Sequence, residues 1–190
     1  MKNICVFLGA NQGSGITFTD AVKNLGQLLV ENELRLIYGG ASVGLMGMLA
    51  NQVLSCGGEV KGVIPEVLMK QEIVHKSLTK LYKVRTMQER KKLMVDLSDA
   101  FIVFPGGIGT LEELFEVWSA IKLAQIHKPL GILNIDGYYD GLLNFIDQAI
   151  ERGLITHDQR NLISVSREPQ SLLHKMVGAL GINPSVVQKK

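Results

Sequence analysis

The 190-residue sequence is poor in cysteine and histidine, and this excludes several classes of protein. Its two cysteines, Cys5 and Cys56, both lie in apolar segments. Two thiols cannot build the disulfide framework of a small secreted domain, so we expect reduced cysteines and a cytoplasmic location. The four histidines are scattered. Because no Cys/His cluster has metal-ligand spacing, we expect neither a metal nor another cofactor.

The sequence also lacks an excess of charge of one sign and long apolar runs. Its net charge of +2 is too small to indicate nucleic-acid or membrane binding, although a local positive patch would suffice for a small anionic ligand. No apolar stretch approaches the roughly 18 residues that a membrane span needs. The first apolar run, Ile4–Leu8, ends too early for a signal peptide. We therefore expect neither nucleic acid nor membrane among the partners.

Short apolar runs rich in β-branched residues alternate with longer amphipathic segments. Such a pattern is typical of a parallel sheet with helices on both faces. It predicts one α/β domain over residues 1–180, with a doubly wound, Rossmann-like sheet of about seven strands, and a flexible tail at 181–190. We expect strands at Ile4–Leu8, Arg35–Tyr38, Val60–Ile64, Leu81–Val84, Ala100–Phe104, Leu130–Asn134 and Leu162–Val165, and helices near 17–32, 44–56, 86–98, 111–126, 138–152 and 169–180.

Glycines cluster directly after three predicted strands, in residues 9–15, 39–47 and 105–110. Ligands of doubly wound sheets bind beyond the carboxyl ends of the strands, so these loops should share one edge. A glycine loop entering a helix presents backbone N–H groups to an anion, although glycines also serve plain tight turns. The loops lack the Walker A lysine and the G-x-G-x-x-G spacing, which argues against a nucleoside triphosphatase and a dinucleotide enzyme. The pattern predicts a phosphate site of another kind.

Two charged residues near this edge each allow two interpretations. Glu113 stands three residues after Thr110, which is the spacing of a capping box with Thr110 as N-cap. The same position also holds a carboxylate one turn above the glycine loop. Arg90 falls in the middle of the apolar stripe of the predicted helix 86–98, so its charge needs a partner. That partner is either a buried carboxylate or the oxygens of a bound phosphate or ribose.

Both residues belong to longer motifs. Residues 105–113 read P-G-G-I-G-T-L-E-E, and residues 87–91 read M-Q-E-R-K. Together they resemble the paired motifs of the LOG family, the nucleotide phosphoribohydrolases that produce free-base cytokinins and related adenines. The resemblance extends from Ile4 to about Leu180 and includes residues 38–47 and the G-Y-Y-D run at 137–140.

The resemblance implies a modified Rossmann fold and a homodimer, with larger assemblies in some relatives. It implies an enzyme that hydrolyses the N-glycosidic bond of a nucleoside 5′-monophosphate, AMP or an N6-modified AMP, to the free base and ribose 5-phosphate. Arg90 and Glu113 would be catalytic. The residues implied in substrate binding are Gly40, Gly44, Glu72, Lys91, Gly106, Gly107, Gly109, Thr110 and Ser119, with Glu72 and Ser119 on the side of the base.

Several positions depart from the family pattern without removing a catalytic residue. Gln88 replaces a usual histidine, residues 7–11 read F-L-G-A-N in place of F-C-G-S-S, and Lys70-Gln71 replaces a Pro-Arg pair. These departures leave the preferred base open. The alternative function is a non-catalytic carrier of a nucleotide or of molybdenum cofactor on the same fold, which would not need both Arg90 and Glu113.

Overall fold

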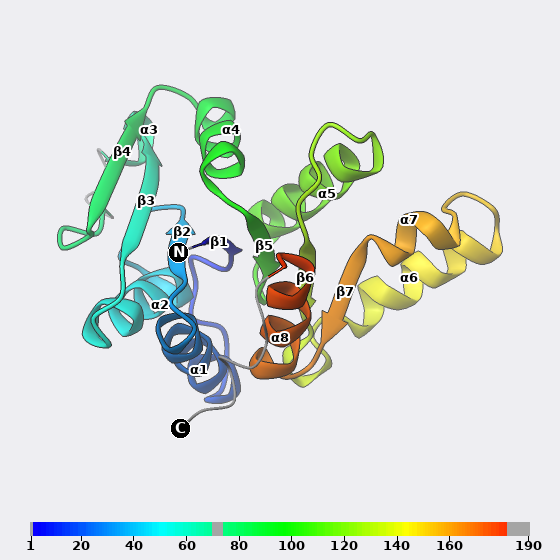
Figure 1. Ribbon diagram of the computed structural model, residues 1–190, viewed down its shortest axis with the longest axis horizontal. Helices are drawn as coiled ribbons and strands as arrows, with labels where there is room; N and C mark the ends of the chain where they lie inside the picture. The colour runs from blue at the N-terminus through cyan, green and yellow to red at the C-terminus, as the bar shows by residue number, and fades with distance from the viewer. Residues whose placement is uncertain (1, 70–73, 182–190) are drawn as a thin grey trace.

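The computed structural model describes residues 2–69 and 74–181 of the chain. Its centre is a seven-stranded, all-parallel sheet in the order β4-β3-β2-β1-β5-β6-β7 (Figure 1). The strands are β1 (Asn3–Phe7), β2 (Arg35–Tyr38), β3 (Val60–Pro65), β4 (Lys80–Val84), β5 (Ala100–Val103), β6 (Leu130–Leu133) and β7 (Ile163–Ser166). The predicted α/β sheet and each of its seven strands are confirmed, with no boundary shifted by more than one residue.

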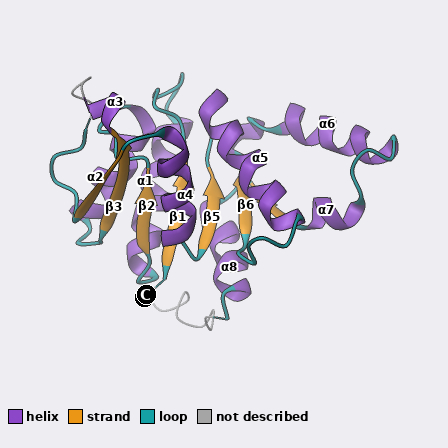
Figure 2. Cartoon of the chain, turned by 90° about the horizontal axis from the view of Figure 1, so that it is seen from above, coloured by secondary structure: helices purple, strands orange, loops and turns teal. Residues whose placement is uncertain are grey.

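Helices cover both faces of the sheet (Figures 1 and 2). They are α1 (Thr17–Glu31), α2 (Gly44–Ser55), α3 (Glu66–Met69), α4 (Met87–Leu97), α5 (Ile108–Lys122), α6 (Asp140–Glu151), α7 (His157–Asn161) and α8 (Pro169–Ala179), with a 3₁₀ turn η1 (Ile135–Gly137). All six predicted helical segments are present. The elements α3, α7 and η1 were not predicted, because about one turn of helix is too short to show a 3.6-residue apolar period.

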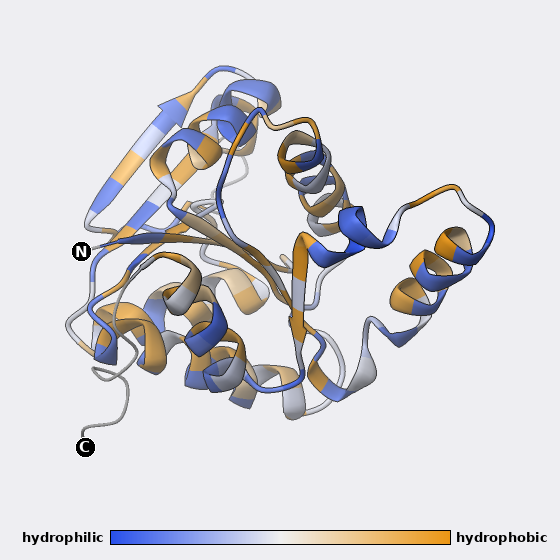
Figure 3. Cartoon of the chain, turned by 45° about the vertical axis from the view of Figure 1, so that its right-hand side comes forward, coloured by the Kyte–Doolittle hydropathy of each residue, from blue (hydrophilic) through white to orange (hydrophobic). Residues whose placement is uncertain are grey.

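The alternation of side chains along the strands creates two separate cores. In β1, Ile4 and Val6 pack with α1, α2 and α8, whereas Cys5 and Phe7 pack with α4, α5 and α6 on the opposite face. Both sets are almost fully buried because successive strand residues point to opposite faces. Figure 3 shows the apolar sides of the helices turned toward the sheet. This two-sided burial accounts for the continuous apolar character of the strands.

The chain order places a crevice beside the central strand. After β1 the chain builds β2, β3 and β4 outward on one side, and it then returns to place β5 on the other side of β1. The connections that leave β1 and β5 therefore diverge to opposite faces, which opens a ligand crevice at the carboxyl ends of these strands. The predicted glycine loops follow β1, β2 and β5 and lie at this edge.

Two further sequence predictions concern the C-terminal tail and membrane spans. The nine residues 182–190, which hold nearly all of the predicted tail, lie outside the described residues. Within the described ranges, no helix has the length and apolar character required to cross a membrane. The helices α6 and α7 lie beyond the β7 edge of the sheet (Figure 1).

Candidate active site

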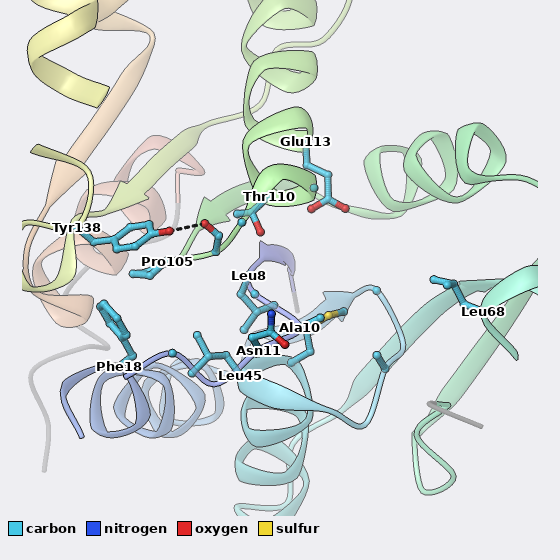
Figure 4. Close-up of a pocket in the computed structure, with 18 of the residues that line it drawn as sticks. Leu8, Ala10, Asn11, Phe18, Leu45, Leu68, Pro105, Thr110, Glu113 and Tyr138 are labelled. Atoms are coloured by element: carbon cyan, nitrogen blue, oxygen red, sulfur yellow. Dashed lines mark hydrogen bonds between the residues drawn. The ribbon is translucent and has the colours of Figure 1, made fainter. Parts of the chain in front are cut away.

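A cavity of about 480 Å³ lies at the carboxyl ends of β1, β2 and β5. Its walls come from all three glycine loops together with side chains of α1, α3, α4 and α5 (Figure 4). The polar groups that reach it include Asn11, Arg90, Thr110, Glu113 and Tyr138. The rest of the wall is apolar or backbone, so a bound ligand would meet few but specific polar contacts.

Close backbone contacts join the loops that form the floor of this cavity. The N–H of Gly9, after β1, donates to the carbonyl of Pro105, after β5, at 3.2 Å. Gly44, after β2, has φ +55°, and a Cβ there would overlap the carbonyl group of Ala10. Only glycine permits that approach. The glycines at these positions therefore set the distance between the three loops.

The first turn of α5 differs from the sequence prediction. The helix begins at Ile108 with Gly107 as its N-cap, and no side chain caps it. The predicted capping box, with Thr110 as N-cap and Glu113 at N3, is therefore wrong, because the N-cap is Gly107, three residues earlier. Thr110 and Glu113 stand inside the helix instead, 4% and 8% exposed, and both line the cavity. Neither side chain serves as a cap, so both remain available to a ligand.

The α5 N-terminus supplies positive potential to the same cavity. The first N–H groups of an α-helix have no intrahelical acceptor, and the helix dipole adds partial positive charge at that end. Gly106, Gly107 and Gly109 line the cavity there. A Cβ on Gly106 would overlap the hydroxyl of Thr110, so the loop lies directly against that side chain. This arrangement suits a phosphate.

Arg90 reaches the cavity from α4, where it both pairs with a buried carboxylate and faces the space open to a ligand. Its guanidinium Nη1 lies 3.5 Å from Oε1 of Glu113, and both side chains are 10% exposed. Its Nε–H also donates to the carbonyl of Val63 at 3.2 Å. The guanidinium lies against Gly39, where a Cβ would overlap Nη2. Arg90 is thus held by β3 and by Glu113 while it still lines the cavity.

The environment of Glu113 favours a carboxyl group that titrates near neutrality. Burial raises its pKa from 4.5 to about 7, and the opposing effect of the Arg90 charge keeps the pKa from rising further. A carboxylate with a pKa close to neutral pH can exchange protons with a substrate or with water. The Arg90–Glu113 pair is therefore a candidate acid–base centre.

Lys91, the neighbour of Arg90, points elsewhere. Its Nζ donates to Oε1 of Glu112 at 2.7 Å and lies 2.5 Å from Oε2 of Glu116. The hydrogen bond that Lys91 donates to Glu112 is the main cause that raises the Lys91 pKa. Glu112 and Glu116 stand one helical turn apart on α5, so Lys91 ties α4 to α5 on the outer side of the Arg90–Glu113 pair. Lys91 does not line the cavity. Its role in binding phosphate or ribose, which the family resemblance implies, stays a prediction.

The other expected binding residues fall into three groups. Gly40 and Gly44 shape the β2 loop but do not line the cavity. Ser119 is exposed on α5 and borders a separate hollow of about 410 Å³, away from the Arg90–Glu113 pair. Glu72 lies outside the described residues. Trp118, the neighbour of Ser119, donates its indole N–H to the Gln159 carbonyl and so ties α5 to α7.

Sequence reasoning missed several residues that line the cavity. Phe18 and Tyr138 meet edge to face, with ring centroids 5.6 Å apart, on one side of the cavity (Figure 4). Asn11 and Leu68 contribute further lining from the β1 loop and α3. The G-Y-Y-D motif was recognised without a role, and its position after β6 was the available signal for Tyr138. Phe18 carries no such signal, because an aromatic residue in a first helical turn is ordinary core composition.

Comparison with known sequences identifies relatives along nearly the whole chain. The family model described as "Possible lysine decarboxylase" matches residues 46–176. The probable cytokinin riboside 5'-monophosphate phosphoribohydrolase LOGL3 of Oryza sativa subsp. japonica is 46% identical over 175 residues, which cover 92% of this chain and 83% of that protein. The cytokinin riboside 5'-monophosphate phosphoribohydrolase LOG1 of Arabidopsis thaliana is 42% identical, with coverage of 100% and 89%.

Solved structures of lower sequence identity share the fold. The molybdenum cofactor binding protein of Rippkaea orientalis superposes with a TM-score of 0.70 at 21% identity, covering 94% of this chain and 97% of that one. The Moco carrier protein of Chlamydomonas gives a TM-score of 0.69 at 17% identity, with coverage of 95% and 98%. At such identities the similarity concerns the fold alone.

Proposed function

The chain belongs to the LOG family of cytokinin riboside 5′-monophosphate phosphoribohydrolases, and from this premise we propose that it hydrolyses the N-glycosidic bond of a nucleoside 5′-monophosphate. The products are the free base and ribose 5-phosphate. The substrate class is AMP or an N6-modified AMP of the cytokinin type. The observation that carries the proposal is the buried Arg90–Glu113 pair, which stands beside three glycine loops at one cavity.

The glycine loops and the α5 N-terminus would hold the substrate phosphate. Gly106, Gly107, Gly109 and Thr110 line the cavity where unpaired helical N–H groups and the helix dipole favour an anion. Thr110 adds a hydroxyl at the same end. A phosphate at this point places the ribose toward Glu113, which lies one turn further along α5. Phosphate contacts remote from C1′ supply binding energy for the reaction, so nucleosides should react poorly.

Glu113 would act at the anomeric carbon. As the C1′–N bond breaks, positive charge develops on C1′ and the ring oxygen, and water adds to C1′. The Glu113 carboxylate stabilises this charge and accepts a proton from the attacking water. The departing base gains one proton. Overall, the hydroxyl of the water is transferred to C1′ of ribose 5-phosphate and a proton to the base. A pKa of about 7 lets Glu113 return its proton at neutral pH.

Arg90 would orient both the carboxylate and the substrate. Its contacts with Val63 and Glu113 leave part of the guanidinium facing the cavity, where ribose or phosphate oxygens can accept hydrogen bonds. Its charge also opposes the effect of burial on the pKa of Glu113. Arg90 thereby favours the ionised carboxylate that the mechanism requires.

Two other functions receive less support. Amino-acid decarboxylation through pyridoxal phosphate needs a lysine that carries the cofactor, and none of the described residues lining the cavity is lysine. A non-catalytic carrier would have no evident need for a carboxylate with a raised pKa beside an anion site. The likeness to molybdenum cofactor carriers is one of fold.

We also propose that the enzyme is a cytoplasmic homodimer. The buried Cys5 and the exposed Cys56 are both free thiols, which fits a reducing compartment. Phe115 on α5 and Phe145 on α6 expose 41% and 63% of their area, and a second copy of the chain would cover such apolar side chains. Light scattering after size exclusion should give twice the mass of the 20.9 kDa chain. A single-chain mass at micromolar concentration would contradict the dimer.

A substrate survey tests the proposed function. The purified protein is incubated with AMP, GMP, CMP, UMP and N6-isopentenyl-AMP, and with adenosine and N6-isopentenyladenosine as unphosphorylated controls. Chromatography then measures released base. We expect base from a purine monophosphate and at most traces from the nucleosides. Intact nucleotides that remain bound to the protein would favour a carrier and reject the hydrolase.

A further inference from the structure

We propose that Tyr138 and Tyr139 are positioning residues that hold the glycine loop after β5 in its phosphate-binding conformation. Building on the proposed function, this inference assigns a role to the G-Y-Y-D motif at 137–140. The hydroxyl of Tyr139 donates to the carbonyl of Phe104 at 2.9 Å, and the hydroxyl of Tyr138 donates to the carbonyl of Gly106 at 2.7 Å. Two consecutive tyrosines thus bind carbonyls at both ends of the Phe104–Gly106 segment (Figure 4 shows the Tyr138 bond).

The carbonyl between them is also occupied. Pro105 accepts the N–H of Gly9 at 3.2 Å, so three consecutive carbonyls of the loop each accept a hydrogen bond from outside it. Because a trans peptide is planar and its N–H is antiparallel to its C=O, a fixed Gly106 carbonyl also fixes the direction of the Gly107 N–H. That N–H belongs to the N-cap of α5. Because its carbonyl oxygens are engaged in these hydrogen bonds, the segment can present N–H groups to an anion without competing negative oxygens.

Hydrogen bonds and an ion pair of neighbouring residues hold the two tyrosines in place. Asn134, at the end of β6, accepts the backbone N–H of Tyr139 at 2.7 Å, and its amide donates to Asp140 at 2.6 Å. Asp140 in turn pairs with Arg167 at 3.1 Å. Gly137 has φ +70°, and a Cβ there would lie 2.6 Å from the Asp140 carboxylate. Each residue of the motif therefore has a part in one hydrogen-bonded turn that connects β6 to the phosphate loop.

The two tyrosines differ in exposure, which makes them separable by experiment. Tyr138 is 48% exposed, lines the cavity and meets Phe18 edge to face. Tyr139 is 2% exposed and does not line the cavity. Burial raises the pKa of the Tyr139 hydroxyl, so it remains a donor across the working pH range. A ligand can contact Tyr138 directly, whereas any effect of Tyr139 on a ligand must pass through the loop.

The test is the affinity for ribose 5-phosphate, measured by calorimetry for the wild type, Y138F, Y139F and the control Y82F, with a thermal melt of each protein. Tyr82 lies on β4 and does not line the cavity. Loss of one loop hydrogen bond should weaken ribose 5-phosphate binding about fivefold in Y138F and in Y139F. Y82F should bind like the wild type. Y138F should melt like the wild type, while Y139F should melt several degrees lower.

The outcomes separate this inference from the proposed function. If Y139F loses thermal stability but binds ribose 5-phosphate as tightly as the wild type, the tyrosine is structural only and the inference is overturned. If only Y138F weakens binding, Tyr138 contacts the ligand directly and the pair does not act through the loop. A wild type that binds ribose 5-phosphate but releases no base from nucleotides would reject the proposed function, and the binding comparison would still decide the role of the tyrosines.

Discussion

Substituting Gly39 by alanine should inactivate the enzyme by displacing the Arg90 side chain, although no catalytic residue is itself replaced. Gly39 is buried at the end of β2, and the added Cβ would overlap Arg90 Nη2 and stand 3.0 Å from Arg90 Cζ and 2.5 Å from Met46 Cε. These atoms are the ends of flexible side chains, so they can move while the backbone stays in place. The guanidinium would have to withdraw by about 1 Å or more to reach ordinary contact distance.

The size of the effect follows from this displacement. A misplacement of about 1 Å in a catalytic group can cost about 100-fold in rate, or about 2.7 kcal/mol of transition-state stabilisation. Overpacking of a core typically costs about 1–3 kcal/mol of stability, so G39A should still fold. The Arg90–Glu113 distance of 3.5 Å would lengthen, and the pKa of Glu113 would rise above its present value of about 7. Activity that requires the carboxylate would then appear only at higher pH.

The assay is base release from N6-isopentenyl-AMP between pH 5 and 9, with a thermal melt of each protein. The control is G141A, because Gly141 lies in α6 with nothing within 4 Å of an added Cβ. G39A should lose about 100-fold in kcat/KM, and its pH profile should shift upward, whereas G141A should match the wild type. A folded G39A with wild-type activity and an unchanged pH profile would refute the role given to Arg90.

Three further predictions follow from the site. Because the pKa of Glu113 is raised, the folded protein binds more protons than the unfolded chain between pH 4.5 and about 7. The stability of the wild type relative to E113Q, measured by urea denaturation, should therefore fall by up to about 3 kcal/mol from pH 4 to 8. A stability difference between the two proteins that does not change with pH would contradict the raised pKa of Glu113. K91M should lower kcat at nearly unchanged KM, because Lys91 joins α4 to α5 through Glu112 and Glu116. K91R should retain more activity, and a rise in KM alone would instead make Lys91 a phosphate ligand. S119A should change kcat/KM less than twofold, since Ser119 lies away from the cavity, and a tenfold loss would place the substrate differently.

Much of the fold could be predicted because the relevant signals are local. Continuous apolar runs identified all seven strands, and their two-sided burial is the reason that the signal is clear. The 3.6-residue period also placed Arg90 on the inward face of α4, where it is 8% exposed. The single-turn helices α3 and α7 carry too few residues for any period and were not predicted.

The parts of the site that could not be predicted depend on packing between distant segments. Thr110 and Glu113 have capping-box spacing, but a glycine N-cap three residues before Thr110 was an equally good start of the helix and is the one used. The partners of Lys91 lie 21 and 25 positions further along the chain, on a different helix, so no spacing rule reveals them. The contact between Tyr138 and Gly106 spans 32 positions and depends on the neighbouring ends of β5 and β6.

The most direct test of the central claim compares base release by the wild type and by E113Q at saturating N6-isopentenyl-AMP, after calorimetry has shown that both bind ribose 5-phosphate. The account predicts that the wild type releases the base and ribose 5-phosphate in equal amounts, and that E113Q binds the product but releases base at least about 100-fold more slowly. Equal rates in the two proteins would contradict the assignment of Glu113 and the mechanism built on it.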